Sequence, residues 1–346
     1  MAEAVTEHLR FRIVRDDAGE RTAGGALGDD ALADAFAAYW PAYRRWMTRA
    51  KPIAMAECVS VLRAHMPELV PTLDALVERF AGVVEACERD EFVRFLTLWN
   101  PPRLVRACSQ LVCDTAEGPM LVRSYDHHPR LFDGVVLGSA WNDASVLAMT
   151  DCLWGALDGM NEHGLAVALA FGGRRVVGEG FAAPLIVRYV LETCATAEDA
   201  REVLARVPSY MPYTFSVVDA EGEFVTAFLG PGRTPRLVAR RAATNHQGAV
   251  EWGAYAKQTQ SVRRLEAVES LLHESLEREE IVRAFLREPI WRSDYERASG
   301  TLYVARYDVG GCELELCWPS ERRRVPLAGD GVALSEIVVP LGESRA

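Results

Sequence analysis

Residues 108 to 126 read Cys108-Ser-Gln-Leu-Val-Cys-Asp-Thr-Ala-Glu-Gly-Pro-Met-Leu-Val-Arg-Ser-Tyr-Asp126. Two short apolar runs are separated by a polar stretch that contains a glycine, which is the pattern of two neighbouring β-strands. Cys108 stands directly before the first run, Arg123 follows fifteen residues later, and Asp126 ends the second run. A thiol, a guanidinium and a carboxylate are groups that nucleophilic catalysis uses, so this segment is a candidate active-site element.

The chain has two parts with different sequence patterns. In the first part, the ranges Ala31 to Thr48 and Val70 to Trp99 repeat apolar residues every three or four positions, which predicts helices. The stretch Asn100-Pro-Pro-Arg103 cannot continue a helix and marks a boundary. We therefore expect a helical N-terminal segment over residues 1–107 and a second, catalytic domain over residues 108–346.

The second part consists of short apolar or alternating runs separated by glycine, asparagine and aspartate. Blocks of strands followed by blocks of helices favour an α+β architecture over strict βαβ alternation. The step Asp158 to Gly164 is typical of a turn, and Thr196 with two acidic residues after it is typical of a helix N-cap. The strands expected are Ser109–Cys113, Met120–Tyr125, Val135–Trp141, Val146–Thr150, Leu165–Phe171, Tyr213–Asp219, Glu223–Leu229, Leu237–Thr244, Thr301–Tyr307 and Cys312–Trp318, and the helices expected are Ala182–Cys194, the segment after Thr196, Ser261–Leu276 and Glu280–Arg287.

The composition excludes several classes of protein. With 346 residues, of which 49% are hydrophobic and 25% charged, the chain is neither disordered nor fibrous. A formal net charge of -11 disfavours nucleic-acid binding, which depends on clustered basic residues. Eight cysteines are too few for a disulfide scaffold, and the N-terminus lacks the apolar core of a signal peptide. Since no uncharged apolar run is long enough for a membrane span, we expect a cytoplasmic protein without nucleic-acid or membrane partners.

An internal cysteine needs activation before it can act as a nucleophile. Its thiol pKa of about 8.5 leaves it mostly protonated at neutral pH. If the bond between Ala107 and Cys108 is cut, Cys108 gains a free α-amine with a pKa of about 8, which can accept the thiol proton. An anionic Asp126 would stabilise that amine, and Arg123 would favour the thiolate. Attack on an amide carbonyl then forms an oxyanion, which an asparagine amide can stabilise by hydrogen bonding.

These residues resemble those of the N-terminal-nucleophile amide hydrolases. Within this group the chain is most similar to the branch typified by isopenicillin N acyltransferase, the acyl-coenzyme A:6-aminopenicillanic acid acyltransferase-like enzymes, and more distantly to the choloylglycine hydrolases. The resemblance covers about residues 105 to 320 and rests on five motifs in the family's order. The motifs are Cys108-Ser109 with Arg123 and Tyr125-Asp126, Gly159-Met-Asn-Glu-His-Gly-Leu165, Ala243-Thr-Asn245-His-Gln, Ser261-Val-Arg-Arg264 and Gly300-Thr-Leu-Tyr303.

The resemblance implies an αββα sandwich, in which two antiparallel sheets lie between helical layers, preceded by a helical prosegment. It implies that Cys108 attacks the carbonyl of Ala107 and cuts its own backbone there. It assigns Cys108, Arg123, Asp126 and Asn245 to catalysis, with Asn245 as an oxyanion donor. The choloylglycine hydrolases have a second oxyanion asparagine, whereas the corresponding strand here has none, so a backbone N–H would have to replace it.

Strand geometry raises a difficulty for this assignment. Successive side chains of a strand point to opposite faces, so Arg123 and Tyr125 share one face while Ser124 and Asp126 share the other. Both charged groups reach Cys108 only if the strand ends or bulges there. The following His127-His128-Pro129 favours such an ending.

Several alternatives stay open. Cys108 could be a buried structural cysteine, as we expect Cys113 to be, and the protein could be a catalytically silent binding protein for small acyl metabolites. An unprocessed cysteine or serine hydrolase could use His128 or His246 as its base. Arg264 is either a substrate-binding residue or a structural partner.

Four further features have weaker assignments. Asn161 is expected to shape a turn, and the glycine-rich stretch Phe171 to Gly180 to form a flexible loop beside the active site. Arg297 is a weak candidate for an active-site arginine. Three aromatic residues are equally compatible with the core and with a pocket for the acyl group: Tyr210, Tyr213 and Trp252.

We therefore expect an autoproteolytic cysteine amidase or N-acyltransferase. Its substrate would be a small N-acyl or peptide-like molecule with a linear amide bond, whose acyl group passes through a thioester on Cys108. This chemistry needs no metal and no cofactor. The prosegment is expected to stay associated after cleavage, and a homo-oligomer is compatible with this prediction.

Overall fold

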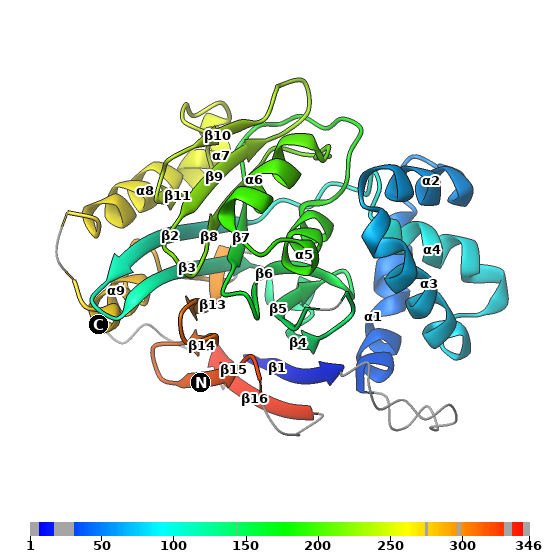
Figure 1. Cartoon of the computed structure of the whole chain (residues 1–346), viewed down its shortest axis with the longest axis horizontal. Coiled ribbons are helices and arrows are strands. Elements are labelled where there is room, and N and C mark those ends of the chain that lie inside the picture. Colours follow the sequence, from blue (N-terminus) through cyan, green and yellow to red (C-terminus); the bar gives the residue numbers. More distant parts are fainter. Residues whose placement is uncertain are drawn as a thin grey trace, which may run out of the picture.

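The computed structural model of the chain describes residues 7–16, 31–142, 144–273, 276–295, 299–328 and 334–341. Within these residues, two β-sheets face each other and helices cover the outer side of each sheet (Figure 1). Arg297, a weak candidate for the active site, lies outside the described residues.

The larger sheet contains nine strands in the part of the chain described. All neighbouring strands run antiparallel except one parallel pair, β1 and β4. In order across the sheet the strands are β10 (Arg236–Val238), β9 (Phe224–Leu229), β8 (Tyr213–Val218), β7 (Ala166–Phe171), β6 (Gly155–Asn161), β5 (Val146–Asp151), β4 (Val135–Ser139), β1 (Glu7–Asp16) and β16 (Leu334–Leu341).

The smaller sheet is antiparallel and contains the segment from which the sequence analysis began. Strands β2 and β3 form a hairpin at its centre, and both contact β7 and β8 of the larger sheet. In order the strands are β11 (Ala242–Ala243), β2 (Ala107–Thr115), β3 (Gly118–His127), β13 (Ser299–Asp308), β14 (Glu313–Cys317) and β15 (Arg322–Pro326), with β12 (Ser293–Asp294) paired to β13.

Helices complete the two outer layers. Helices α5 (Ala183–Thr193) and α6 (Ala197–Arg206) pack on the larger sheet, and α8 (Ser261–Ser270) and α9 (Arg278–Phe285) on the smaller one, with α7 (Gly253–Gln258) beside α8. Thr196 caps α6 in a capping box with Asp199, as its sequence indicated. The predicted α+β class and the αββα order of layers are confirmed.

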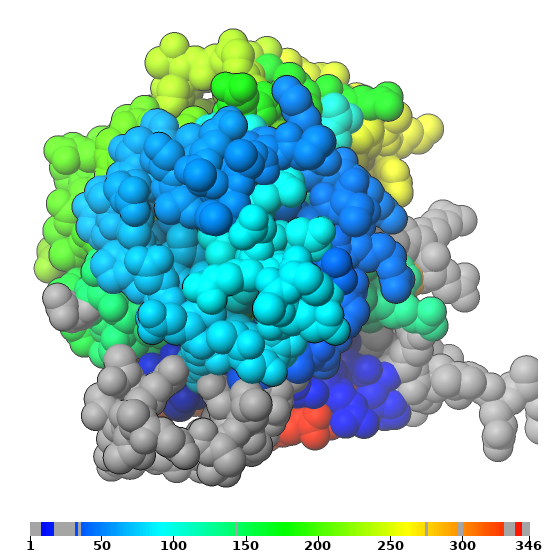
Figure 2. Space-filling view, turned by 90° about the vertical axis from the view of Figure 1, so that its right-hand side faces the viewer, coloured from blue at the N-terminus to red at the C-terminus, as the bar shows by residue number. Residues whose placement is uncertain are grey.

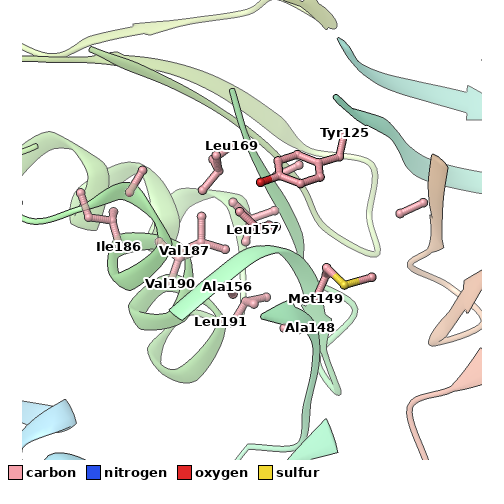
Figure 3. Packing of buried hydrophobic residues seen from close by; sticks show 14 of the residues in the cluster. Tyr125, Ala148, Met149, Ala156, Leu157, Leu169, Ile186, Val187, Val190 and Leu191 are labelled. Atoms are coloured by element: carbon pink, nitrogen blue, oxygen red, sulfur yellow. The ribbon is translucent and has the colours of Figure 1, made fainter. Parts of the chain in front are cut away.

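The core between α5 and the larger sheet shows why a glycine is needed in β6. Leu157 and Leu169 of the sheet lie against the apolar face of α5 (Figure 3). Each fully buried leucine contributes roughly 1.5–3 kcal/mol to stability. A Cβ added at Gly159 would lie 2.7 Å from Leu191 Cδ1 and 2.8 Å from Ala148 Cβ. Glycine therefore lets the helix approach the strand closely, and a larger residue would separate these layers.

The prediction of a helical first part missed one strand. Strand β1 lies inside the larger sheet, parallel to β4 and antiparallel to β16. Leu9, Phe11 and Ile13 are buried and alternate with exposed or half-buried arginines. This period of two is the strand pattern, and it is present in the sequence but was overlooked.

The N-terminal helices are α1 (Ala31–Met47), α2 (Met55–His65), α3 (Val70–Arg79) and α4 (Arg89–Thr97), and they pack beside α5 and β6 at one end of the sandwich (Figures 1 and 2). The Trp154 indole N–H donates to the carbonyl oxygen of Leu96 at 2.9 Å, and the Tyr189 hydroxyl donates to Glu68 at 2.7 Å. These hydrogen bonds join the helices to the sandwich. The expected boundary at residues 107 and 108 falls at the start of β2.

Two local predictions also differ from the structure. The expected turn from Asp158 to Gly164 begins later, because β6 extends to Asn161. Asn161 shapes that turn, since its Oδ1 accepts hydrogen bonds from the backbone N–H groups of His163 and Leu165. The expected strand Leu237–Thr244 is two short strands in different sheets.

Among the helices described, none is both long and apolar enough to span a membrane.

Candidate active site

Cys108 lies near the start of β2 and has no exposed surface. It pairs with Tyr125 on β3, and residues that pair in this way point to the same face of the sheet. Arg123, two residues from Tyr125, shares that face. Gln110, on the same face, accepts a hydrogen bond from Ser216 of the larger sheet at 2.8 Å. We call this the inner face, because it points toward the larger sheet.

Arg123 places its guanidinium against the thiol of Cys108. Nη2 lies 3.2 Å from Sγ, and Nη1 donates to the Tyr303 hydroxyl at 2.7 Å and to the Asp158 carboxylate. The guanidinium carbon lies 4.7 Å from the centre of the Tyr125 ring. Arg123 and Asp158 are both fully buried, so the ion pair and the tyrosines hold the cation in one position beside the sulfur.

In the continuous chain Cys108 has no free α-amine beside its thiol. Burial raises the pKa of the Cys108 thiol above its ordinary value, and Arg123 opposes that shift by favouring the thiolate. The nitrogen of Cys108 is a peptide N–H that donates to Asn245 Oδ1 at 3.0 Å. A peptide nitrogen cannot accept the thiol proton, so the general base expected from the sequence exists only after the bond to Ala107 is cut.

The amide of Asn245 has a defined orientation. Its Oδ1 accepts from the N–H of Cys108 and, at 2.6 Å, from Arg264 Nη2. Its Nδ2 therefore points the other way and donates to the carbonyl oxygens of Phe171 at 3.2 Å and Arg106 at 3.4 Å. The donor side of this amide thus lies at the backbone just before the bond expected to be cut.

The loop after β7 reaches Asn245 because Gly173 has no side chain. Gly173 has a φ of +70°, and an added Cβ would lie 2.2 Å from the carbonyl oxygen of Asn245. A Cβ at the preceding Gly172 would lie 2.7 Å from Nε2 of Gln247. The glycine-rich loop therefore borders the segment that carries Asn245.

Arg264 binds the backbone of Cys108 from the other face of the sheet. It lies in the first turn of α8 and is fully buried. Its Nη1 donates to the carbonyl oxygen of Cys108 at 2.7 Å and to Ser109 Oγ at 2.9 Å, and its Nε donates to the carbonyl oxygen of Thr259 at 2.8 Å. With Nη2 on Asn245, every nitrogen of this guanidinium has a protein partner. Arg264 thus fixes the backbone at Cys108.

Asp126 does not share the face of the sulfur. Strand β3 ends at His127, near the expected point, but the alternation of side chains holds up to that residue. Asp126 pairs with Ala107, whereas Arg123 shares the inner face with Cys108. The carboxylate therefore points to the outer face, which α8 and α9 cover.

The partners of Asp126 are cations and a hydroxyl on that outer face. Thr301 Oγ1 donates to Asp126 Oδ1 at 2.8 Å, and Oδ2 lies 3.7 Å from Arg264 Nη1 and 4.0 Å from Arg292 Nη1. Burial raises the pKa of Asp126, and the two arginines oppose this shift. In the described residues, the link from Asp126 to Cys108 runs through Arg264.

The two histidines considered as alternative bases have other partners. His246 Nδ1 lies 2.8 Å from Ser261 Oγ, and His128 Nδ1 accepts the backbone N–H of Arg130 at 3.1 Å. Burial lowers the pKa of His246. No hydrogen bond joins either histidine to Cys108 in the part of the chain described.

The sequence analysis missed several residues of the site. Asp158 and Tyr307 belong to the cluster that fixes Arg123, since the Tyr307 hydroxyl donates to Asp158 Oδ1 at 2.5 Å. Tyr255 donates its hydroxyl to the carbonyl oxygen of Arg106. An acidic residue inside the apolar run of β6 was the available signal for Asp158, because a buried carboxylate needs a cation or several donors.

Comparison with known families gives one clear match. The family model described as acyl-coenzyme A:6-aminopenicillanic acid acyl-transferase matches residues 113–323, which is more than half of the chain. No curated protein sequence is significantly similar to this chain.

Several solved structures are similar at low sequence identity. A variant of the conjugated bile acid hydrolase from Clostridium perfringens is 12% identical over 66% of this chain and 96% of that one, with a TM-score of 0.45. The N-acylethanolamine-hydrolyzing acid amidase orthologue of Caenorhabditis elegans is 16% identical over 59% and 93%, with a TM-score of 0.44. Penicillin V acylase from Agrobacterium tumefaciens is 16% identical over 66% and 90%, with a TM-score of 0.46.

Proposed function

Because this chain belongs to the acyl-coenzyme A:6-aminopenicillanic acid acyl-transferase family, we propose that it is an autoproteolytic cysteine amidase or N-acyltransferase. One observation carries the proposal. The sulfur, the nitrogen and the carbonyl oxygen of Cys108 each contact a buried polar side chain, which are Arg123, Asn245 and Arg264 respectively. A structural cysteine in a core needs none of these contacts.

The first reaction is cleavage of the protein's own backbone. The thiol of Cys108 loses its proton and attacks the carbonyl carbon of Ala107, and Arg123 favours the thiolate. The C–N bond between Ala107 and Cys108 then breaks, and the nitrogen takes up a proton to become a free amine. The acyl group of Ala107 is left on the sulfur as a thioester. Water hydrolyses this thioester, which gives a carboxylate on Ala107 and restores the thiol.

The second reaction uses the same thiol on a substrate. The new α-amine of Cys108 has a pKa of about 8 and accepts the thiol proton near neutral pH. The thiolate attacks the amide carbonyl of a small N-acyl or peptide-like substrate, the leaving amine takes up the proton, and a thioester forms. Water or an amine resolves the thioester, and the thiol is restored. Asn245 Nδ2 supplies an oxyanion donor once the carbonyl of Arg106 has left it.

The first part of the chain stays bound after cleavage in this proposal. Strand β1 is hydrogen-bonded on both sides within the larger sheet, and the end of α4 is hydrogen-bonded to Trp154, just before β6, and to Ala182, just before α5. Separating the two fragments would expose the buried faces of β1 and α4, which costs more than one broken peptide bond provides.

Trapping the acyl-enzyme tests the proposal and separates it from a silent binding protein. The chain is mixed with a series of N-acyl p-nitroanilides, quenched in acid and weighed by intact-mass spectrometry. The fragment from residue 108 to 346 should gain the mass of one acyl group, and hydroxylamine should remove it, because a thioester reacts with this amine. Cys108→Ala should gain nothing. Acylation of Cys108→Ala would contradict the proposal. So would a wild-type chain that is acylated by none of the substrates.

A further inference from the structure

Arg106, one residue before the predicted cleavage position, is held in a buried acidic site. Its Nη2 lies 2.6 Å from Oδ2 of Asp151 at the end of β5, and both side chains are about 95% buried, with exposed fractions of 6% and 5%. The guanidinium carbon also lies 5.7 Å from the centre of the Tyr125 ring. An arginine in a linker ordinarily projects into solvent, so this burial needs a specific explanation.

A second carboxylate completes the acidic site. Asp133 is buried, and the Tyr43 hydroxyl from α1 lies 2.5 Å from each of its oxygens. Burial and the neighbouring Asp151 raise the pKa of Asp133 to about 7, and Arg106 opposes that shift. We call Asp133, Asp151 and the face of Tyr125 the acidic subsite. Arg106, which reaches this subsite, stands two residues before Cys108 in the chain.

The backbone of the linker is also held as a bound peptide would be. The Tyr255 hydroxyl and Asn245 Nδ2 both donate to the carbonyl oxygen of Arg106. The Tyr213 hydroxyl lies 3.5 Å from the carbonyl oxygen of Leu104. Phe171 packs edge-on against both tyrosines, with ring centres 5.2 Å and 6.1 Å apart. The segment before Cys108 is thus held by buried side chains up to the residue that carries the thiol.

This arrangement has a chemical consequence that rests on the proposed function. In self-cleavage the acyl group on the sulfur is the chain that ends in Arg106 and Ala107. That thioester is of the same kind as the one a substrate forms, since both carry their acyl group on the sulfur of Cys108. The linker therefore shows which acyl group the site accepts: a small residue at the carbonyl and a cation one residue before it.

Charge balance requires a cation in the acidic subsite after cleavage. If Arg106 moves out, Asp151 is left as a buried carboxylate whose ion-pair partner has gone, and an unpaired buried charge is strongly unfavourable. A second cation of similar length restores the pair. We propose that the acidic subsite selects substrates that carry a guanidinium or similar cation on the acyl side, one residue before the amide that is cut.

Protection of Cys108 from alkylation tests this inference on the processed wild-type chain. The probes are two tetrapeptides, acetyl-Leu-Val-Arg-Ala and acetyl-Leu-Val-citrulline-Ala, which differ by one charge and have almost the same shape. The concentration that halves the rate of Cys108 carboxymethylation by iodoacetate is read by peptide mapping. The arginine peptide should protect at a concentration at least about 10-fold lower, because only the arginine peptide restores the buried ion pair with Asp151. The chain's own Arg106 competes equally with both probes and does not alter the ratio.

A double variant, Arg106→Gln with Asp151→Asn, serves as the matched control. It replaces the buried ion pair by two neutral amides and leaves no unpaired charge, and the ratio between the two probes should fall to about one. Three outcomes would overturn this inference and leave the proposed function intact. Both peptides could protect the cleaved wild-type chain equally, neither peptide could protect it, or the double variant could retain the ratio between the probes. A wild-type chain that intact-mass spectrometry finds uncut would overturn the proposed function as well.

Discussion

Cys108 and Cys113 lie on the same strand, but their side chains point to opposite faces of the sheet. Cys108 points to the inner face, where Arg123 contacts its sulfur. Cys113 is five residues further along β2 and points to the outer face, toward α8 and α9. Burial raises the pKa of Cys113 to about 12, and Asp114 adds to that shift. Both thiols are buried, so burial alone does not distinguish a nucleophile from a structural cysteine.

The two faces of strands β2 and β3 carry different parts of the site. The inner face carries the sulfur and the cation that favours its thiolate. The outer face carries Asp126 and Ser109, which contact Arg264, and Arg264 in turn binds the carbonyl oxygen of Cys108. A hairpin supplies both sets from one short segment because its side chains alternate. Variants on the inner face should therefore change reactivity, and variants on the outer face should change stability first.

The largest effect is expected from exchanging sulfur for oxygen at the two cysteines. Cys108→Ser should slow self-cleavage on the order of 10³-fold, because a hydroxyl is a far weaker nucleophile than a thiol near neutral pH. Cys113→Ser, the matched control, should cleave at the wild-type rate. Gel densitometry of freshly translated protein over time measures both rates. Slow cleavage in both variants would show that the two faces are not distinct.

Removal of the cation on the inner face should have the next largest effect. Arg123→Gln should lower turnover about 100-fold, which is the usual cost of losing one positioned charged donor. Since Arg123 lowers the thiol pKa, the pH profile of cleavage should also move to higher pH. Arg123→Lys keeps the charge and should keep the wild-type pH profile better than Gln. A loss of rate without any change in the pH profile would show that Arg123 acts only in packing.

A change on the outer face should act mainly on stability. Asp126→Asn should lower the free energy of unfolding by about 2 kcal/mol, because Arg264 and Arg292 lose their buried carboxylate. Urea unfolding by circular dichroism measures this change. Asp114→Asn removes a carboxylate from the exposed pair with Arg241 and should cost less than about 1 kcal/mol. A larger loss from Asp114→Asn than from Asp126→Asn would reverse the assignment.

The last effect appears only as the pH is lowered and concerns a histidine on the inner face. Burial and Arg106 lower the pKa of His127 well below 6.5. The folded chain therefore keeps this ring neutral while the unfolded chain takes up a proton, so stability is present above pH 6.5 and falls as the pH decreases. Between pH 7 and pH 5 the titration of His127 should lower the free energy of unfolding by about 2 kcal/mol, and His127→Gln should remove that part of the pH dependence. An unchanged slope in His127→Gln would mean that the ring is charged in the folded chain.

The sequence predicted the α+β class and most of the strands because period and turn residues are local signals, whereas the sandwich came from the resemblance to the family. Strand β1 was missed although its alternation is clear, because the helices that follow it dominated the interpretation of the first hundred residues. The single strand expected up to Thr244 is broken, since β10 and β11 pair with different sheets. Pairing partners that are distant in sequence have no local signature.

The sequence predicted those residues of the site that belong to recognisable motifs. Motifs placed Cys108, Arg123, Asn245 and Arg264 at positions that converge in the structure. Alternation correctly placed Asp126 on the face opposite to Arg123. Asp158 was missed although it stands inside the apolar run of β6. Asp151 and Tyr255 were not predictable, because each acts through a contact between distant segments and neither has a distinctive neighbour in the sequence.

Intact-mass spectrometry of the purified wild-type chain beside Cys108→Ala tests the central claim most directly. The account predicts two wild-type fragments, of residues 1–107 and 108–346. The sum of their masses should equal the mass of the full chain plus one water. It predicts a single uncut chain for Cys108→Ala. A wild-type chain that stays whole while it hydrolyses amides, or a Cys108→Ala chain cut at the same bond, would contradict it.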